Sequence, residues 1–371
     1  METSRIDNKT PHRAVHPSEI IKDEIDARGM NKKEFAERMG MKASNVSRLL
    51  RGDNDITVQV AEKLEDAFGI PASHWTAMQH AYNREVKEIN ERNKEEITAI
   101  EIESRLSEIF NLGELYKRLG IGCYMFVQKK LEKLGEILHT RPTDIMSMMP
   151  AIIGVYKSTR HHIDDKNLRT WTLLAYASSL SSTPCGKYSE GNALCAAQQI
   201  RDIAHSGVVT EAKMAKILND NGIAYSVVKK IEAVPVDGFS TYACGYPSIV
   251  TTHRFDDMNR LVFTILHELG HIHLHFKDNE QCSFVSLGDT VSSDNAMEMQ
   301  ANTFAQSVLI NDDVWKDIMN TTIHGLYTEN IVSTLKKKAK EFGLSFPIVL
   351  WRYKYETKKY NIRGGKTTPI V

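Results

Sequence analysis

The decisive stretch of the chain is His267-Glu268-Leu269-Gly270-His271, in which two histidines stand four residues apart with a glutamate after the first. On an α-helix this spacing places both imidazoles on one side, about 6 Å apart along the axis and about 40° apart around it. Two ring nitrogens so placed converge on one ion at roughly 2.1 Å each. Glu268 then reaches a water bound to that ion and takes its proton as the catalytic general base. The pattern therefore predicts a zinc hydrolase.

Apolar residues around this pattern support a helix. They recur at helical spacing, which indicates a buried amphipathic helix, and they are Leu261, Ile265, Leu269 and Ile272. The two histidines lie on a different stripe of the same helix. The alternative interpretation is a pair of core histidines that are satisfied by hydrogen bonds and bind no metal.

A catalytic zinc site usually has a third protein ligand and one open position. His275 lies about 12 Å from His267 along a continuous helix, too far to share the ion, and Lys277 stands where a long-spaced third histidine would be. Glu298 is the better candidate because it lies beside an apolar face, where a carboxylate needs a partner. That face comprises Met297, Ala301, Phe304 and Val308. The alternative is an exposed glutamate on a surface helix.

Two further residues are expected to hold the ligand histidines in place. Asn302 lies four residues after Glu298 and therefore on the same side of its helix. It is placed to form a hydrogen bond with the outer ring nitrogen of a ligand histidine. We assign the same supporting role to His275. This set of residues predicts one Zn²⁺ per chain.

Both segments resemble the ImmA/IrrE family of metallo-endopeptidases. The family pattern H-E-L-G-H-x-x-L-H matches residues 267–275, and the pattern E-x-x-A-N/D-x-F-A matches residues 298–305. Residues 234–240 and 247–251 are also similar, so the resemblance covers roughly residues 190–320. It implies zinc ligation by the two motif histidines and Glu298, with Glu268 as general base. Because the family includes proteases that cleave a partner repressor, it also implies a peptide-bond substrate.

Strands are expected upstream of the zinc helix. The sequence predicts a strand from Ile223 to Ile231, a turn at Asp237-Gly238 and a short strand at Pro247–Thr252. An extended substrate is expected to pair along the edge of the last strand. Four residues nearby are open candidates for stabilising a tetrahedral oxyanion, although such residues more often pack or face solvent. They are Tyr242, Tyr246, His253 and Arg254.

The amino-terminal part predicts four short helices, at residues 18–27, 32–39, 43–50 and 57–68. Ser18 is expected to cap the first, and Asn31 with Glu34 forms a capping box for the second. The second and third, joined by a turn that contains Gly40, form a helix-turn-helix. Its predicted core comprises Phe35, Ala36, Met39, Val46, Leu49 and Leu50.

The third of these helices carries polar residues that are expected to face the major groove of DNA. They are Ser44, Asn45, Ser47 and Arg48, with Lys42 and Arg51 near the ends of the helix. Residues 16–21, 30–36 and 45–52 resemble the lambda-repressor-like (XRE) family, and residues 70–75 extend the similarity to HigA-type antitoxins. The resemblance implies operator DNA binding by a homodimer and repression of transcription.

Two departures from that family concern charge and capping. Lys42 replaces a helix-capping serine, and Asp53-Asn54-Asp55 stands where a basic cluster is usual. Residues 1–80 hold 12 Lys and Arg against 13 Asp and Glu, so a single copy is expected to bind DNA weakly. A dimer that uses Lys42, Arg48 and Arg51 is still expected to be specific. The alternative is a helix-turn-helix kept for contacts with proteins.

The chain as a whole predicts an α+β fold that is predominantly α. We expect a helix-turn-helix domain at 1–80, a helical middle region at 81–190, a zincin-like domain with a small sheet at 191–320 and a helical extension at 321–371. Within the middle region, residues 81–108 predict a long linker helix or a short dimer seam.

Composition indicates the cellular compartment that we expect for this protein. Five cysteines without a C-x-x-C pair predict no disulfide framework, and they are Cys123, Cys185, Cys195, Cys244 and Cys282. The net charge of zero gives no global attraction to polyanions. No signal-peptide pattern opens the chain, and no apolar run approaches the length of a membrane helix. We therefore expect a cytoplasmic protein without a membrane partner.

Together these features predict a DNA-binding regulator that carries its own zinc endopeptidase. The expected substrate is a regulatory protein, a repressor or a toxin–antitoxin partner, cut in response to stress, phage or mobile-element signals. One alternative is an antitoxin-like repressor whose zinc fold is structural or sensory. The other is a stand-alone protease whose first domain only docks partners.

Overall fold

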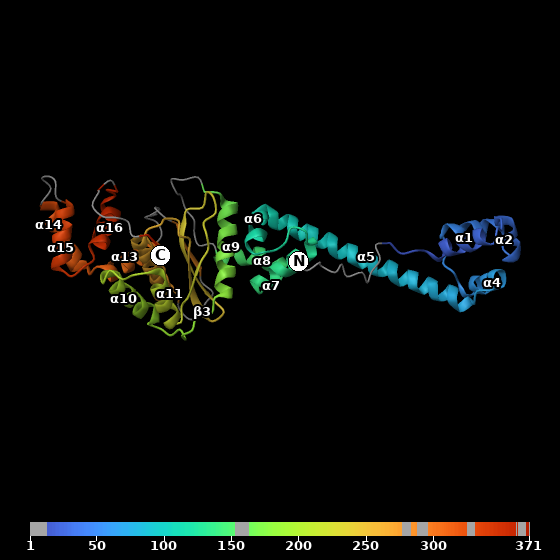
Figure 1. Ribbon diagram of the computed structural model, residues 1–371, viewed down its shortest axis with the longest axis horizontal. Helices are drawn as coiled ribbons and strands as arrows, with labels where there is room; N and C mark the ends of the chain where they lie inside the picture. Colours follow the sequence, from blue (N-terminus) through green and yellow to red (C-terminus); the bar gives the residue numbers. More distant parts are fainter. Residues whose placement is uncertain are drawn as a thin grey trace. The chain divides into compact units, whose positions relative to one another are not determined.

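The computed structural model (Figure 1) describes residues 13–152, 163–276, 283–287, 296–324, 331–360, 362 and 369–370. The chain divides into two compact units, Met1–Glu101 and Ile102–Val371. Helices predominate and one four-stranded sheet lies in the second unit, which confirms the predicted α+β, mainly α class. Two residues considered from the sequence lie outside the described residues. They are Lys277, at the position of a long-spaced third histidine, and Cys282, one of the five cysteines.

The first unit is built from four short helices and the start of a long one. They are α1 (Pro17–Ala27), α2 (Lys32–Arg38), α3 (Ala43–Arg51), α4 (Val58–Phe68) and α5 (Ala72–Ile109). All six residues predicted for the core of the helix-turn-helix are buried. Trp75, on the first turn of α5, completes that core with a fully buried ring 5.8 Å from the ring of Phe68.

The predicted helix starts are right in one case and wrong in another. The capping box of α2 is present, since Asn31 Oδ1 accepts from Glu34 N–H at 3.0 Å and Glu34 Oε2 accepts from Asn31 N–H at 3.0 Å. Ser18, in contrast, lies inside α1 and does not cap it. His16 is the cap, because its Nδ1 accepts the Ser18 N–H at 3.0 Å and Pro17 occupies the first helical position.

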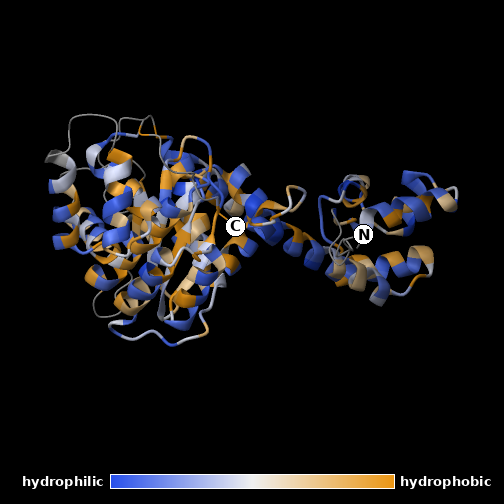
Figure 2. Ribbon diagram, turned by 60° about the vertical axis from the view of Figure 1, so that its left-hand side comes forward, coloured by the Kyte–Doolittle hydropathy of each residue, from blue (hydrophilic) through white to orange (hydrophobic). Residues whose placement is uncertain are grey.

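The helix predicted over residues 81–108 is part of α5, which begins earlier, at Ala72. Pro71 precedes it, and the Ala72 N–H is capped by Glu65 Oε2 at 2.8 Å. The middle turns of α5 are drawn mainly in blue in Figure 2, as expected from their many charged residues.

In the second unit the strands are β1 (Ala224–Val227), β2 (Val236–Ala243), β3 (Tyr246–Thr251) and β4 (Ser283–Leu287), in the order β1-β3-β2-β4. Strand β3 runs parallel to β1 and antiparallel to β2, and β2 runs antiparallel to β4. The expectation that Pro247–Thr252 offers an edge to a substrate is therefore wrong. Both sides of β3 are already paired, and the pairing with β1 depends on a long-range contact that local pattern does not show.

The turn predicted at Asp237-Gly238 is also wrong. Both residues lie within β2, where the register with β4 shifts between Val236 and Gly238. The hairpin turn between β2 and β3 is instead Cys244-Gly245, with φ of 54° and 86°, the backbone that a two-residue hairpin requires.

Helices cover both faces of the sheet (Figure 1). Helix α9 packs on one face through β1, β2 and β3, and α12 packs on the other through β2, β3 and β4. Of these two, α9 is Asp165–Ser181 and α12 is Met258–His275. Phe239 points to the first face, against Trp171 of α9, so its neighbours Gly238 and Ser240 point to α12.

The remaining helices surround this core. They are α6 (Leu112–Arg118), α7 (Val127–Leu138), the 3-10 helix η1 (Pro142–Asp144), α8 (Ile145–Ile152), α10 (Asn192–His205), α11 (Glu211–Asp220), α13 (Ala296–Leu309), α14 (Asp312–His324), α15 (Ile331–Glu341) and α16 (Phe346–Thr357). Helices α10, α13 and α16 pack on α12. Among the described residues, no helix is both long and apolar enough to cross a membrane.

Candidate metal centre and helix-turn-helix surface

The predicted zinc helix is α12, and it is buried almost throughout, from Met258 to Ile272. Helix α13 packs closely against it at Gly270. A Cβ added there would lie 3.1 Å from Ala301 Cα and 3.1 Å from Phe304 Cδ1, tighter than an ordinary van der Waals contact. The glycine of the motif is therefore required by the close approach of two helices. This approach brings the first turn of α13, which carries Glu298, beside the two histidines.

Three predicted ligand residues meet at this point. Nε2 of His267 and Nε2 of His271 are 3.0 Å apart, and the Glu298 carboxylate oxygens lie 3.2 Å from each. The two histidines are buried and the glutamate is partly buried. The sequence placed Glu298 beside an apolar face, and Ala301 does lie in the core, whereas Met297 is 49 % exposed.

Hydrogen bonds on the far side of each imidazole set the direction of its lone pair. Nδ1 of His267 donates to Asn302 Oδ1 at 3.0 Å. Nδ1 of His271 lies 3.0 Å from Nδ1 of His275, whose Nε2 donates to Gln300 Oε1 at 2.9 Å. A histidine that donates through one nitrogen presents the lone pair of the other. Both Nε2 lone pairs therefore point toward Glu298.

This donor set fits a zinc ion. Two nitrogen lone pairs and a carboxylate are three acceptors that face one another, and a cation satisfies them all. Ligands on a tetrahedral zinc with bonds of 2.0–2.2 Å stand roughly 3.3 Å apart, close to the 3.0 Å and 3.2 Å separations found here. Histidine, histidine and glutamate with one open position is a ligand set of catalytic zinc.

The pKa values of the ligand groups follow from burial and from one another. Among the protein groups alone, burial lowers the pKa of His271 to about 4. Burial also acts to lower the pKa of His267, but the Glu298 carboxylate reverses the shift and raises it. Burial acts against the charge of Glu298, yet the rings of His267 and His271, whose Nε2 atoms lie 3.2 Å from its oxygens, hold its pKa well below the usual range. The glutamate is thus ready to bind as an anion.

Glu268 lies fully buried between α12 and the sheet. Within the described part of the chain, neither of its carboxylate oxygens has a hydrogen-bond partner, which is costly for a charged group. Burial accordingly raises its pKa to about 7, against the lowering effect of His267. Gly238 of β2 makes room for it, because a Cβ at this position would collide with the Glu268 carboxylate and lie 2.9 Å from Thr264 Cγ2. This role of Gly238 was not predicted from the sequence, although the glycine inside an apolar strand pattern was the available signal.

A cavity of about 90 Å³ opens beside this centre. The candidate ligands His267 and Glu298 line it with Asn302, and further residues of α12, of β2 and β4, and of α16 and the segment after it complete its walls. These are Asp237, Arg260, Phe263, Thr264, Ser286, Leu287, Trp351, Tyr355 and Tyr360. The aromatic residues of α16 lie 80 or more residues after the motif, and no local pattern connected them to it.

Three of the four oxyanion candidates are engaged elsewhere, and none of the four lines the cavity. Tyr242 OH donates to Gly245 O at 3.1 Å, within its own hairpin. Nε2 of His253 is 2.9 Å from Glu211 Oε1, and Arg254 stacks on Phe255. None of these, nor Tyr246, is among the described residues that line the cavity.

In the first unit, the predicted DNA-contacting residues lie on the surface of α3. Lys42, Ser44, Asn45, Arg48 and Arg51 are exposed, and Ser47 is half-buried. Two of the cations have partners nearby, since Arg48 donates to Asn54 Oδ1 at 2.8 Å and Arg51 pairs with Asp53 at 2.7 Å. A groove between α2 and α3 is lined by Lys32 and Lys33 as well as Lys42. The first two of these lysines were not predicted from the sequence.

The structure thus defines a chain with a helix-turn-helix module and a domain of the metallopeptidase class. A model of the helix-turn-helix family matches residues 21–75, and a model of the IrrE N-terminal-like domain matches residues 228–354. The chain belongs to the helix-turn-helix family of lambda-repressor-like regulators and carries an ImmA/IrrE-type peptidase domain in its second unit. Both predicted resemblances are confirmed.

Two curated proteins are similar to part of the chain. Over 97 residues it is 27 % identical to virulence-associated protein I of Dichelobacter nodosus, covering 26 % of this chain and 90 % of that protein. Over 67 residues it is 33 % identical to the uncharacterized HTH-type transcriptional regulator YddM of Escherichia coli (strain K12), covering 18 % of this chain and 71 % of that protein.

Proposed function

We propose that the chain is a DNA-binding regulator whose second unit is a zinc-dependent endopeptidase that cleaves a regulatory protein. One observation carries the peptidase part. Three ligand atoms, 3.0 Å to 3.2 Å apart, face each other beside a buried carboxylate that has no hydrogen-bond partner among the described residues. A buried unpartnered carboxylate costs stability, and a role in proton transfer accounts for its presence.

In this proposal His267, His271 and Glu298 hold one Zn²⁺. The metal would acidify a water molecule and polarise the scissile carbonyl. Glu268 takes the proton of the attacking water and gives it to the leaving amine, a task for which a pKa of about 7 is suited. Asn302 and His275 keep the two ligand imidazoles in the tautomer that presents Nε2.

The peptidase proposal is tested by zinc content and cleavage together. The wild-type protein, Glu268→Gln and Glu298→Ala are measured by elemental analysis and then mixed with a library of unstructured peptides, with cuts identified by mass spectrometry. We expect one zinc per chain and cleavage in the wild type, zinc without cleavage in Glu268→Gln, and loss of zinc in Glu298→Ala. Glu190→Gln, an exposed substitution of the same chemistry, is the matched control. Cleavage by Glu268→Gln would contradict the mechanism.

For the first unit we propose operator DNA as the ligand, bound by a homodimer through α3. The candidate contacts are Lys42, Ser44, Asn45, Ser47, Arg48 and Arg51, which lie together on or beside one helix surface. A fragment of the protein's own promoter is the probe in a mobility-shift titration at several salt concentrations. Loss of a base contact should cost roughly 5- to 150-fold in affinity for Arg48→Ala, and Lys22→Ala on α1 is the control.

Protein docking by the first unit is a second candidate. The pairing of Arg51 with Asp53 and the slight excess of acidic residues favour it, because both weaken attraction to phosphates. No shift of promoter DNA even at low salt would favour this function over the operator. The antitoxin-like alternative predicts a zinc-loaded chain that cuts no peptide.

A further inference from the structure

The cavity beside the metal centre has one strongly aromatic wall. Phe263 stands one helical turn before His267 on α12, with ring centroids 6.5 Å apart. The rings of Trp351 and Tyr355 approach Phe263 to 4.6 Å and 5.2 Å and stack on each other at 5.2 Å with 12° between their planes. We refer to these three residues as the aromatic wall.

We propose that the aromatic wall is the specificity subsite of the peptidase and takes a large apolar side chain next to the scissile bond. The inference rests on the proposed function, because it specifies which substrate residue lies next to the peptide bond that the proposed metal centre cleaves. Leucine, methionine and phenylalanine are the side chains that suit the wall. The wall stands directly beside His267, so a side chain on it belongs to a residue adjoining the reacting carbonyl.

The charges around the cavity favour an apolar occupant over a charged one. Asp237 is its second acidic residue besides Glu298, and its carboxylate is paired with Arg260 at 2.6 Å and lies 3.7 Å from Arg254. The guanidinium of Arg260 in turn covers the ring of Phe255 at 3.8 Å. Among the residues that line the cavity, Asp237 and Arg260 are therefore paired with each other, and a charged substrate side chain would lose water without gaining a dedicated partner.

The size of the cavity supports a side chain of this class. Its volume of about 90 Å³ gives room for roughly six to nine water-sized groups. A scissile amide together with an isobutyl or thioether side chain contains a comparable number of non-hydrogen atoms. An alanine would leave much of the wall uncovered, and the apolar area that each substrate buries sets the preference.

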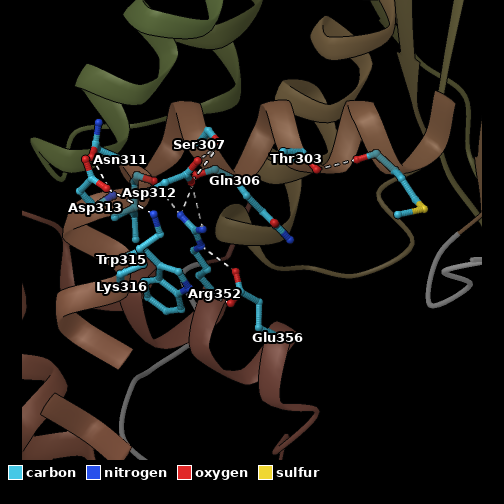
Figure 3. A network of polar contacts seen from close by, with 12 residues as sticks. Thr303, Gln306, Ser307, Asn311, Asp312, Asp313, Trp315, Lys316, Arg352 and Glu356 are labelled. Atoms are coloured by element: carbon cyan, nitrogen blue, oxygen red, sulfur yellow. Dashed lines mark hydrogen bonds and ion pairs between the residues drawn. The ribbon is translucent and has the colours of Figure 1, made fainter. Parts of the chain in front are cut away.

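The aromatic wall is held in place by an elaborate set of contacts around Arg352, the residue after Trp351 (Figure 3). This arginine is 3 % exposed. It donates to Gln306 O at 2.8 Å and to Ile310 O at 2.7 Å, which are carbonyls at the end of α13. It also pairs with Glu356 at 2.9 Å and lies over the Trp315 ring at 4.4 Å.

These contacts tie α16 to the helix that carries Glu298. The last carbonyls of a helix lack partners within the helix, and the buried guanidinium supplies a charged donor to Ile310 O and a second donor to Gln306 O, which also accepts from Ile310 N–H at 3.0 Å. Trp315 Nε1 donates to Glu356 Oε2 at 2.7 Å and thereby adds α14 to the same assembly. The wall and the ligand helix are thus positioned together, as a subsite beside a metal requires.

The test measures binding and not turnover. The probes are the N-acetyl hydroxamates of alanine, leucine, phenylalanine and glutamate, which share one zinc-binding group and differ in the side chain. Their dissociation constants for the full zinc-loaded chain are measured by calorimetry after its zinc content has been determined. We expect the leucine and phenylalanine probes to bind roughly 10- to 50-fold more tightly than the alanine and glutamate probes.

Variants then test whether the aromatic wall causes the preference for the leucine probe over the alanine probe. Trp351→Ala should reduce the difference between the leucine and alanine probes to about threefold or less, while Lys354→Ala should keep it, since Lys354 is on the same helix but does not line the cavity. Should Trp351→Ala fail to fold, Trp351→Leu and Tyr355→Leu make the same comparison with less loss of packing. Thermal unfolding of each variant checks that it is folded.

The outcomes separate the subsite from the proposed function. Equal binding of the four probes to a zinc-loaded wild type overturns the aromatic wall as a subsite and leaves the peptidase proposal standing. Retention of the full preference in every wall variant also overturns it. A wild-type chain that takes up no zinc after reconstitution overturns the proposed function, and the subsite with it.

Discussion

Gly270 gives the sharpest test of how the metal centre is assembled. In Gly270→Ala the added Cβ lies 3.1 Å from the backbone Cα of Ala301, and a backbone atom inside a helix cannot turn away as a side chain can. Restoring an ordinary contact requires α12 and α13 to separate by roughly 0.3–0.5 Å. Metal ligands tolerate deviations of roughly 0.2 Å, so Glu298 would leave its position 3.2 Å from the histidine nitrogens.

In Gly270→Ala we expect a small change in the free energy of unfolding and a larger change in zinc affinity. Crowding of the helix contact costs about 1–3 kcal/mol, and replacing glycine by alanine inside a helix returns about 1 kcal/mol. We therefore expect the free energy of unfolding of the metal-free protein to fall by about 0–2 kcal/mol, and zinc affinity to fall by roughly 10- to 100-fold. Zinc affinity is measured by competition with a fluorescent chelator, and stability by denaturant unfolding.

Gly113→Ala is the matched control for this prediction. Gly113 also lies in a helix, α6, but a Cβ there would meet only Asn111 Oδ1, at 3.7 Å. The control should therefore keep wild-type zinc affinity and gain up to about 1 kcal/mol of stability. If Gly270→Ala binds zinc as tightly as the control does, close packing of α12 on α13 is not what positions Glu298, and the argument fails.

Three further predictions concern the surroundings of the centre. Asn302→Leu should weaken zinc binding roughly 10- to 100-fold with little loss of fold, because His267 loses the acceptor of its Nδ1–H; unchanged affinity by chelator competition would contradict the assigned role. Arg352→Met should lower the free energy of unfolding by about 3–5 kcal/mol, because it removes the charged donor of the Gln306 and Ile310 carbonyls and breaks a largely buried ion pair with Glu356. An unfolding curve like that of the wild type would refute it. Burial lowers the pKa of His205, whose Nδ1 accepts from Ser345 N–H. As the pH falls, the unfolded chain therefore binds a proton at this histidine before the folded chain does. The contribution of His205 to the free energy of unfolding should be constant above about pH 6.5 and should decline as the pH falls below that value. His205→Gln should reduce that decline in unfolding curves recorded between pH 7.5 and 5, and an equal slope in both proteins would count against it.

The helix-turn-helix was predictable from sequence because its determinants are local. The Asn31–Glu34 capping box joins residues three apart, and the buried positions of α3 recur once per helical turn. Ser18 shows the limit of such reasoning. It has the right type for a cap, but Pro17 had already begun the helix, and the imidazole of His16 took the capping role.

The candidate metal centre was partly predictable from the sequence. The spacing of His267 and His271 predicted convergence, and the structure brings Glu298, Asn302 and His275 to them; their roles as ligands and supports stay predictions. Gly238 was misread as a turn because a glycine after an aspartate in a strand-rich region commonly makes one. Its actual reason, the room that Glu268 needs, depends on a helix that follows 20 residues later.

By itself the sequence determined which segments are helical, which faces are apolar and which two histidines share a side, since each of these follows from backbone geometry over a few residues. Only the tertiary structure decided that β3 is an interior strand and that the rings of α16 flank the metal centre. It also showed that Arg352 ties α16 to α13. Such contacts join residues far apart in the chain, and they form only where whole surfaces fit at close-packed density. Periodicity tells which side of a helix is buried, whereas the partner that buries it is chosen by the shape and volume of everything else in the core.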